Sequence, residues 1–593
     1  MKRFLASFRF DPILHLNSDR IPFSTPNYEV FWRGYIANTV ELQGMAKDSG
    51  WKMEQPAEAD LFLFAYQQWG PDIPRHVLGE YSVVICDKPR RRLLLTHDEL
   101  GLTPLFYAEL KDELLVASHL EDAVQVYGVR SLDEEYIADY LGEGRHLGKR
   151  TPYSHIHRLL PGQSVVWKDG LLAEYKTWTL IGIPPIQYRD SREYEDELRR
   201  LTAEAVSFSV QSRGKTWCEL SGGLDSSTVL AFAVRSGARN VEAFSLIYPI
   251  SKTADERKWI SFVLEKYPVP WHTLDYDAVR PFSEIPSGFI GQPSLLHIDA
   301  APQSHYHEIL RTNEVDLVLT GQGGDATFLG DSPDPYYLAD LLRRFHLRQY
   351  WTALQPWKNA SRQKRPLMYW LTHFGSRPWL RHRKGQFVEY EAMPVPWISP
   401  RFAEQHDLIR AGQASNVPPQ ASIGNSWAME GILRIANSIS IYFQAPNMAC
   451  DFRHPLLYRP LLAFMLSVPW EFKLHPQCDR LLQRRAFEGI LPEPTVHRGN
   501  KLGPNQIYYA GLAAGAEWCE RLTKNPRIVQ RGYVELQPWR DAIEQARQGR
   551  TIGIRFLWAT ASLEMWLQQL EEGFGAQAQS VAANPAHGHT SPL

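Results

Sequence analysis

Short apolar runs alternate with turn residues in the first part of the chain. Four such runs occupy residues 81–87, 91–98, 105–110 and 113–119, separated by polar, Pro- and Gly-containing stretches. Runs of this length between turn residues are typical of antiparallel strands. The pattern predicts a β-rich domain over residues 1–185, built as stacked sheets.

The pattern changes after residues 181–190, which contain two prolines and are interpreted as an interdomain linker. Residues 193–210 then place apolar side chains near helical spacing. Beyond them, short apolar runs alternate with helical segments, which predicts a doubly wound parallel α/β sheet; the predicted strands are 216–220, 241–248 and 315–321, with a helix over 227–237. We expect a second domain over residues 193–574, mostly helical after residue 400, and a small, polar, disordered tail over residues 575–593.

The composition is that of a soluble globular protein with more than one domain. The 593 residues are 44% hydrophobic and 22% charged, with a net charge of −2, and this length exceeds that of a single core. Five cysteines form no Cys-x-x-Cys pair, which favours reduced thiols and a cytoplasmic location. No apolar stretch reaches the ~18 residues of a membrane span. The balanced bulk charge argues neither for nor against nucleic acid, which we do not expect as a partner.

The sequence Glu-Leu-Ser-Gly-Gly-Leu-Asp-Ser-Ser-Thr (residues 219–228) lies between a predicted strand and a predicted helix. A strand, a glycine-rich loop and a helix in this order place backbone N–H groups and a positive helix end around an anion. Glycines permit close backbone approach, and serine hydroxyls can bind phosphate oxygens. Asp225 would repel phosphate and therefore indicates Mg²⁺. The predicted nucleotide-binding residues here are Leu220, Ser221, Gly222, Gly223, Asp225, Ser226 and Ser227.

A second loop with an aspartate follows the predicted strand 315–321. It contains Gly321, Gln322, Gly323 and Asp325. Two carboxylates from neighbouring loops suit magnesium, which takes few protein ligands when phosphates supply the others. We therefore predict a metal site formed by Asp225 and Asp325, with Gly321 and Gly323 lining the nucleotide. Alone, the second loop could be a simple turn.

These motifs carry a resemblance to a known family. Ser-Gly-Gly-Leu-Asp-Ser-Ser resembles the pyrophosphate loop of ATP pyrophosphatases, and residues 319–330 resemble the second signature loop of the asparagine synthetase family. Residues 451–472 and 480–501 resemble later segments of that family, and the N-terminal part resembles its glutaminase domain. The resemblance implies a glutaminase-like (Ntn-type) sandwich followed by a synthetase domain. It also implies a ligase that uses ATP and Mg²⁺, adenylates a carboxylate and releases AMP and pyrophosphate.

The chain departs from that family at two places. The family's glutaminase uses an N-terminal cysteine, whereas Lys2 stands here and the nearest cysteine, Cys86, falls in a predicted strand. We therefore expect no glutamine hydrolysis. Gln322 stands where β-lactam synthetases have tyrosine and asparagine synthetases have glutamate. With the missing cysteine, this is most similar to lasso peptide cyclases.

That similarity implies an enzyme that adenylates an Asp or Glu side chain of a precursor peptide and closes a macrolactam with the N-terminal amine. Its expected partners are the precursor peptide, a leader-recognition protein and a leader peptidase. One alternative is an ammonia-dependent asparagine synthetase-like or β-lactam synthetase-like ligase of small molecules. Another is a non-catalytic scaffold that binds peptide or RNA.

Four residues are candidates for catalysis by the same resemblance. Lys501 would stabilise charge that develops at phosphorus and at the acyl centre; otherwise it is a solvated surface lysine. Asp451 either positions the amine or pairs with an arginine. Gln322 lies in the second loop, and Arg484 matches a family arginine that contacts phosphate or pairs with an acid, as does Arg480, which replaces a family lysine.

Residues 341–388 contain eleven Lys or Arg and no Asp or Glu, with aromatic residues between them. This belt is interpreted either as an exposed helical face over a buried aromatic stripe or as a dock for a peptide, a partner protein or RNA. We favour a peptide or a partner protein. A zinc site at His297, His305, His307 and Glu308 is not expected, because His305 and His307 are two residues apart on a predicted helix and point in different directions.

Overall fold

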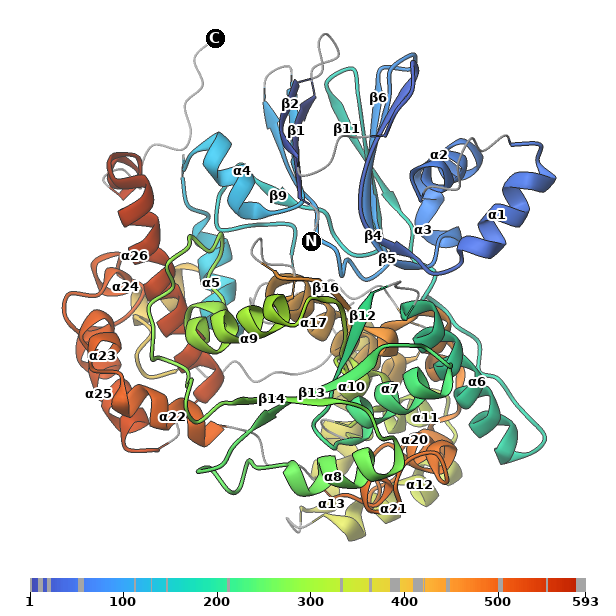
Figure 1. The fold of residues 1–593 in the computed structure, drawn as a ribbon. Coiled ribbons are helices and arrows are strands. Elements are labelled where there is room, and N and C mark those ends of the chain that lie inside the picture. The colour runs from blue at the N-terminus through green and yellow to red at the C-terminus, as the bar shows by residue number, and fades with distance from the viewer. Residues whose placement is uncertain are drawn as a thin grey trace.

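The computed structural model describes most of the chain. The described residues are 3–8, 14–18, 23–51, 58–110, 113–129, 131–144, 148–210, 214–330, 334–361, 365–383, 395–408, 420, 422–443, 448–499, 505–550 and 553–582. Two domains lie one above the other in Figure 1, with the N-terminal β-rich domain at the top.

The N-terminal domain is built from two antiparallel sheets, as the apolar runs predict. The first has the order β2 (Leu14–Ser18), β1 (Phe4–Phe8), β8 (Glu113–Ala117), β7 (Phe106–Leu110) and β9 (His157–Arg158). The second has the order β11 (Leu171–Lys176), β10 (Gln163–Lys168), β6 (Arg92–His97), β5 (Gly79–Asp87), β4 (Tyr28–Ile36) and β3 (Phe23–Ser24). The four runs used for the prediction are β5, β6, β7 and β8.

Alternate side chains of the two sheets form one hydrophobic core between them. Phe8 of β1 meets Phe31 of β4 edge to face, with ring centroids 5.8 Å apart. Tyr107 of β7 and Trp167 of β10 are buried in the same cluster. The outer face of the six-stranded sheet packs on α1 (Thr39–Asp48), α2 (Glu58–Trp69) and α3 (Ile73–His76).

The C-terminal domain contains a parallel sheet, as predicted. Its order is β14 (Trp271–Asp275), β13 (Val241–Ile247), β12 (Lys215–Glu219), β15 (Val315–Leu319) and β16 (Asp451–Arg453), and every neighbouring pair is parallel. One face packs on α6 (Ser191–Ser209) and α7 (Leu224–Arg235). The other face packs on α9 (Ala300–Thr312) and α17 (Ile423–Tyr442).

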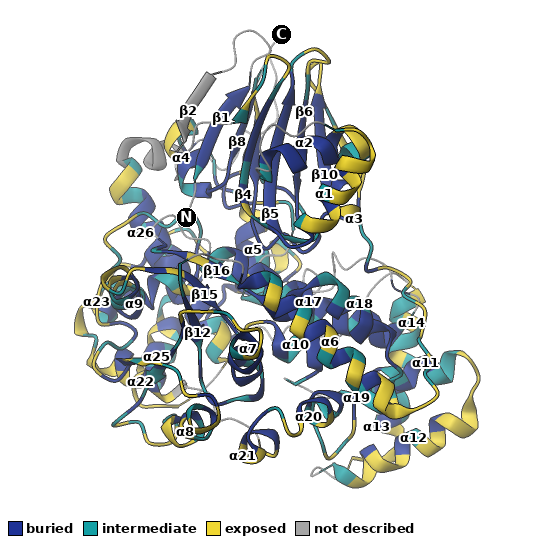
Figure 2. Ribbon diagram, turned by 45° about the vertical axis from the view of Figure 1, so that its right-hand side comes forward, coloured by how far each residue is buried: buried dark blue, intermediate teal, exposed yellow. Residues whose placement is uncertain are grey.

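Further helices pack around both domains, and Figure 2 shows that their buried faces point inward. They are α4 (Leu120–Tyr127), α5 (Glu134–Glu143), α8 (Arg257–Lys266), α10 (Gly324–Phe328), α11 (Tyr337–Arg343), α12 (Leu347–Ala360), α13 (Leu367–Leu371), α14 (Arg377–Arg383), α15 (Pro400–Gln405), α18 (Arg459–Ser467), α19 (Trp470–Lys473), α20 (Leu481–Phe487), α21 (Glu493–Val496), α22 (Asn505–Ala514), α23 (Ala516–Thr523), α24 (Arg527–Gln530), α25 (Leu536–Arg547) and α26 (Ile554–Ala582). None of the helices in the described part of the chain is long and apolar enough to cross a membrane.

The structure agrees with the predicted linker and only partly with the predicted tail. The linker 181–190 contains no helix or strand, and α6 begins directly after it with a capping box between Asp190 and Glu193. The predicted tail is partly wrong, because α26 continues to Ala582 and makes its first eight residues helical. Residues 583–593 lie outside the described residues.

Buried polar contacts join the two domains. The Arg158 guanidinium, on β9, donates a hydrogen bond of 2.6 Å to Asn437 Oδ1 and also contacts the Ser440 hydroxyl, both on α17. Glu80, on β5, accepts hydrogen bonds from the backbone N–H of His454 at 2.6 Å and from its ring at 3.0 Å. Because unpaired buried charges are costly, these contacts favour a single relative placement of the domains.

We predict that Arg158→Met lowers the free energy of unfolding by about 2–4 kcal/mol, because it leaves Asn437 and Ser440 buried without their donor. Arg150→Met is the matched control: Arg150 pairs with Asp133 but is half exposed, so its loss costs under ~1 kcal/mol. Urea unfolding followed by fluorescence measures both. Equal losses for the two variants would contradict the role of Arg158 at the interface.

Candidate functional site

The glycine-rich loop joins β12 to α7 at the carboxyl edge of the parallel sheet. Leu220 is buried, and its N–H donates to the Phe244 carbonyl at 2.7 Å. Gly222 has a φ of +64°, and a Cβ there would lie 2.6 Å from the Trp259 carbonyl carbon, so only glycine fits. Gly223 is the N-cap of α7. The loop therefore presents a helix N-terminus, as the motif predicts for an anion site.

The three serines of this loop differ in their surroundings. Ser226 Oγ accepts from the Ser221 N–H at 3.1 Å and lies 3.1 Å from Ser221 Oγ. Ser221 is half-buried, whereas Ser226 and Ser227 are buried. Ser227 Oγ has no hydrogen-bond partner within the described part of the chain. Ser221 is thus the serine that a phosphate can reach most directly, and phosphate binding by Ser227 stays a prediction.

The second loop, between β15 and α10, packs against the first. A Cβ on Gly321 would lie 2.7 Å from the Ser226 nitrogen, and one on Gly324 would lie 2.3 Å from Asp225 Cγ. Gly323 has a φ of +88°. The absence of side chains at these positions lets the two backbones touch, which brings Asp325 beside Asp225.

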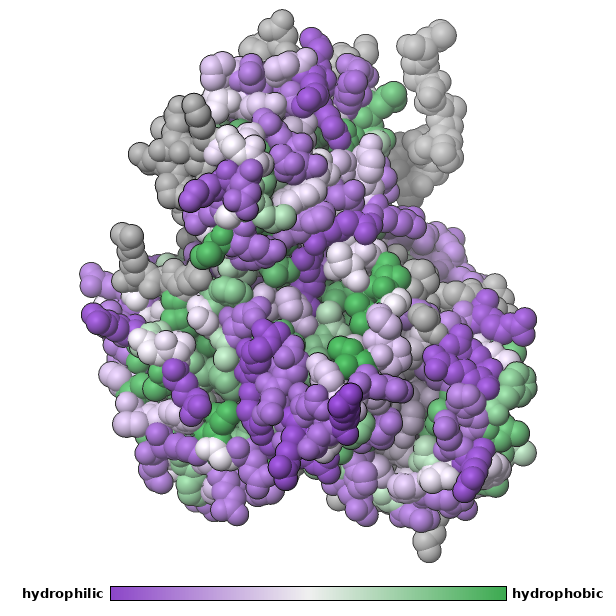
Figure 3. Space-filling model, turned by 90° about the vertical axis from the view of Figure 1, so that its right-hand side faces the viewer, coloured by the Kyte–Doolittle hydropathy of each residue, from purple (hydrophilic) through white to green (hydrophobic). Residues whose placement is uncertain are grey.

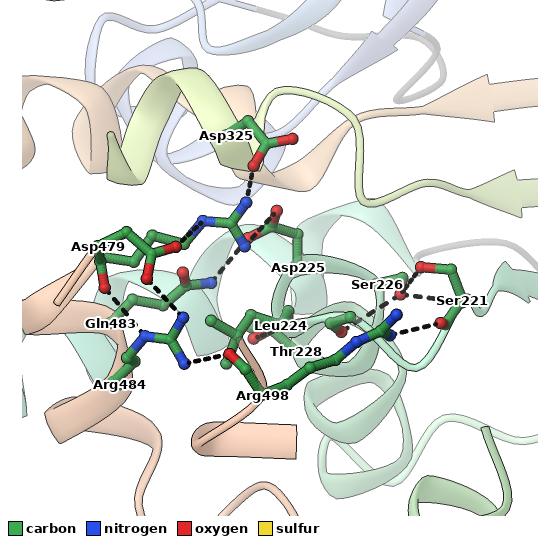
Figure 4. Close-up of polar contacts among 12 residues, drawn as sticks. Ser221, Leu224, Asp225, Ser226, Thr228, Asp325, Asp479, Gln483, Arg484 and Arg498 are labelled. Atoms are coloured by element: carbon green, nitrogen blue, oxygen red, sulfur yellow. Dashed lines mark hydrogen bonds and ion pairs between the residues drawn. The ribbon is translucent and has the colours of Figure 1, made fainter. Parts of the chain in front are cut away.

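Asp225 and Asp325 share one cationic group, the guanidinium of Arg480. Figure 4 draws it without a label, joined by dashed lines to both labelled aspartates. Arg480 Nη1 lies 3.3 Å from Asp225 Oδ2, and Nη2 contacts Asp325 Oδ1. Gln483 Nε2, on α20, donates to Asp225 Oδ1 at 2.9 Å. The two carboxylates therefore face a common point, as the predicted metal site requires.

This arrangement fits Mg²⁺. The ion prefers oxygen ligands and is held in nucleotide sites by one or two carboxylates together with phosphates. Asp225 and Asp325 would hold it, and Arg480, which now lies between them, would have to move aside. No group of three or more His, Cys, Asp and Glu side chains gathers as a metal site among the residues that the structure describes.

Arg498 belongs to the site although the sequence did not indicate it. Its guanidinium donates to the Ser221 carbonyl at 3.3 Å and to Glu256 Oε1 at 2.6 Å, and it lies 4.8 Å from the ring centroid of Trp259. Arg498 thus joins the glycine-rich loop to the segment that follows α21. A cation here can balance the charge of bound phosphates.

The predicted catalytic residues fall in different places. Gln322 is exposed in the second loop, and its N–H donates to Thr320 Oγ1 at 3.2 Å. Arg484 is fully engaged elsewhere: it donates to Asp479 Oδ1 at 2.7 Å and to the Arg498 carbonyl at 3.0 Å. Arg484 therefore pairs with an acid and holds the chain near Arg498, which was one of its two interpretations. Lys501 lies outside the described residues.

Asp451 starts the edge strand β16, where it is exposed. It pairs in register with Leu317, two residues before the carboxyl end of β15. Arg33, on β4 of the N-terminal domain, is buried, and burial lowers the pKa of its guanidinium to about 10, with the negative charge of Asp451 acting against that shift. The charge of Asp451 thus acts on a buried arginine, and positioning of the amine by Asp451 stays a prediction.

Cys86 is the single cysteine of residues 1–185. It lies in β5 with 1% of its surface exposed. Burial, aided by the charge of Glu29, raises the pKa of its thiol to about 12. At neutral pH this side chain is a protonated core residue and not a nucleophile. Lys2 lies outside the described residues.

Comparison with known protein families agrees with this geometry. Residues 197–568 match the family described as asparagine synthase, and residues 8–178 match a glutamine amidotransferase domain. The chain belongs to the asparagine synthase family. The first match contains both acidic loops and Arg480, and the second covers the β-sandwich except for most of β1.

Several curated proteins are related over about half to most of their length. Asparagine synthetase [glutamine-hydrolyzing] 3 of Bacillus subtilis is 22% identical over 520 residues, which are 84% of this chain and 78% of that protein. Asparagine synthetase [glutamine-hydrolyzing] 1 of the same organism is 22% identical over 586 residues, or 92% and 87%. Amidase chyE of Penicillium rubens is 23% identical over 321 residues, or 50% and 46%.

Members of the asparagine synthase family are ATP-dependent ligases that form amides and release AMP and pyrophosphate, and they use ATP with Mg²⁺. The expectation of ATP and Mg²⁺ is therefore confirmed at the level of the family. Within this chain, the two loops that carry Asp225 and Asp325 are the part that fits ATP and Mg²⁺.

We predict that Cys86 stays unmodified when the folded protein is treated with iodoacetamide near pH 8. A thiol with a pKa of about 12 carries only about one thiolate in ten thousand there. The half-buried Cys478 and Cys519 are internal comparisons, and denaturant should expose all five thiols. Mass spectrometry of the digested protein measures the labelling; rapid labelling of Cys86 in the folded state would show that its site is open.

We predict that Gly324→Ala abolishes the stabilisation of the protein by Mg-ATP, since the added methyl group overlaps the Asp225 carboxylate. Gly44→Ala is the control, because nothing lies within 4 Å of a Cβ at that helical position. Thermal unfolding with and without Mg-ATP measures the shift in melting temperature. If Mg-ATP raised the melting temperature of Gly324→Ala as much as that of the unaltered protein, this loop would not take part in nucleotide binding.

Proposed function

We propose that this chain is a lasso peptide cyclase. It would adenylate an Asp or Glu side chain of a precursor peptide and close a macrolactam with the N-terminal amine of the same peptide. The observation that carries the proposal is the buried, protonated Cys86 in the amidotransferase-like domain. Without a reactive thiol there, glutamine is not the source of the amine, so the substrate itself is the simplest source.

The acidic loops supply the first half of the reaction. Backbone N–H groups at the start of α7 would bind the pyrophosphate end of ATP, and Asp225 and Asp325 would hold Mg²⁺ against it. A substrate carboxylate oxygen attacks the α-phosphorus, and pyrophosphate leaves with its charge balanced by Arg498 and Arg480. The product is an acyl-adenylate, a far better acyl donor than the free carboxylate.

Ring closure is the second half. The N-terminal ammonium gives one proton to solvent and the free amine attacks the acyl carbon. AMP leaves with the bonding electrons of the acyl–oxygen bond, and a second proton passes from nitrogen to solvent as the amide forms. Holding both ends of one peptide together can remove on the order of 7–11 kcal/mol from the barrier. The Gly-Gln-Gly-Gly-Asp sequence supports a cyclase because Gln322 has no phenol to act as a base, unlike the tyrosine at this place in β-lactam synthetases. A leader-recognition protein and a leader peptidase would act on the same precursor.

An ammonia-using ligase of small molecules is the second candidate. It is favoured by the names of the curated relatives, several of which are asparagine synthetases. In that case free ammonia would attack the acyl-adenylate of aspartate or a similar acid. A scaffold without catalysis is disfavoured by the complete pair of acidic loops.

We predict release of AMP and pyrophosphate when the protein receives ATP, Mg²⁺ and the core of a precursor peptide encoded by a neighbouring reading frame. The peptide product should be lighter by one water molecule. Asp225→Asn should lower the rate by about 10²–10³-fold, whereas Cys86→Ala should keep it.

Two altered peptides sharpen this experiment. Acetylation of the N-terminal amine should block ring closure, and replacement of the acceptor Glu by Gln should block AMP release. Turnover with free aspartate and ammonium chloride, but not with peptide, would overturn the cyclase in favour of the second candidate. Loss of activity in Cys86→Ala, with the fold intact, would restore a role for the thiol.

A further inference from the structure

The described part of the basic belt forms a group of short helices, α11 to α14, at the edge of the C-terminal domain. Its interior follows the first of the two interpretations, a buried aromatic stripe. Tyr350, Trp357, Trp370 and Phe374 are buried and pack into one hydrophobic cluster with α17. Burial of these aromatic side chains holds the helices together. It does not explain why other large apolar side chains of the same helices are exposed.

The outer surface of the belt is unusually apolar. Fifteen large hydrophobic side chains are exposed in the described part of the chain, and six of them lie between residues 345 and 380. Phe345 is 75% exposed and Met368 is 66% exposed. The others are Leu347, Trp351, Leu367 and Leu380. Single exposed apolar residues are ordinary, whereas apolar side chains that gather on one surface are typical of interaction sites.

The same surface is strongly basic. Within the described part of residues 341–388, eight Lys or Arg side chains occur and no Asp or Glu. Arg344 and Arg348 are exposed and flank Phe345 and Leu347 in the sequence. Figure 3 shows this edge of the domain at the lower right, where hydrophobic and strongly hydrophilic side chains lie next to each other. The remainder of the protein is net negative, so the belt is a positive surface on an acidic molecule.

We propose that this surface, formed by α11 to α14, docks an acidic polypeptide segment that carries exposed apolar side chains. The composition distinguishes a protein from other anionic partners. Seven of the eight described cations are arginines, and Arg, Met and aromatic residues are enriched in protein interfaces, whereas Lys, Asp and Glu are depleted. Arginine also pairs with carboxylates through two parallel hydrogen bonds, which suits Asp and Glu.

This inference goes beyond the proposed function and does not depend on it. The surface would recruit an acidic partner protein. Charge would attract the partner, and Phe345, Trp351 and Met368 would supply the desolvated contacts that hold it.

Binding of a defined probe to the full-length protein tests the surface. The probe is a fluorescent synthetic helix with Glu on one face and Leu and Phe on the other, measured by anisotropy at several salt concentrations. A triple variant, Phe345→Ser, Trp351→Ser and Met368→Ser, should weaken binding about tenfold or more. Arg344→Glu with Arg348→Glu should weaken it similarly and reduce its dependence on salt.

The chain offers a matched control. Leu171 and Ile250 are 75% and 74% exposed but lie outside the belt, so Leu171→Ser with Ile250→Ser should change binding less than twofold. All these residues are at the surface, and circular dichroism checks that each variant is folded. The proposal is overturned if the probe does not bind or if the control pair weakens binding equally. It is also overturned if poly-uridine or phosphatidylserine vesicles bind the belt while the probe does not.

Discussion

The pairing of Asp225 and Asp325 around one cation is the interaction on which the rest of the synthetase site depends. Two carboxylates that are close enough to contact the same guanidinium repel each other unless a positive charge lies between them. In this structure the charge belongs to Arg480. Any arrangement that replaces this guanidinium must supply an equivalent charge, and a divalent ion bound to a nucleotide does so.

The parallel sheet makes this pairing possible. Strands β12 and β15 are neighbours, with Cys218 opposite Leu319, so their following loops leave the sheet side by side. The glycine at position 321 then lets its loop approach the backbone of Ser226, and the glycine at position 324 leaves room for the Asp225 side chain. The metal site is therefore a consequence of strand order and small residues. The β-sandwich above it contributes buried contacts, such as Glu80 with His454, and no reactive thiol among its described residues.

Sequence patterns predicted the parts of this structure that are encoded locally. Apolar runs identified β5 to β8, β12, β13 and β15, and the glycine-rich loops identified the ends of β12 and β15, because strand, turn and helix signals are read over a few residues. Arg498 and Gln483 could not be predicted in the same way, since they lie 277 and 258 residues from their partners in the glycine-rich loop. The match of Arg484 to a family arginine left two interpretations open, and its partner in the structure is Asp479. The polar composition of the tail hid the continuation of α26, which packing of its earlier, apolar turns supports.

A crystal structure with Mn²⁺ and a non-hydrolysable ATP analogue would test the central claim most directly. Anomalous scattering locates the Mn²⁺ ion without reference to the protein. The account predicts one peak within about 2–2.5 Å of a carboxylate oxygen from both Asp225 and Asp325, with the Arg480 side chain displaced from between them. A peak bound to phosphates alone, with Arg480 still joining the two aspartates, would contradict it.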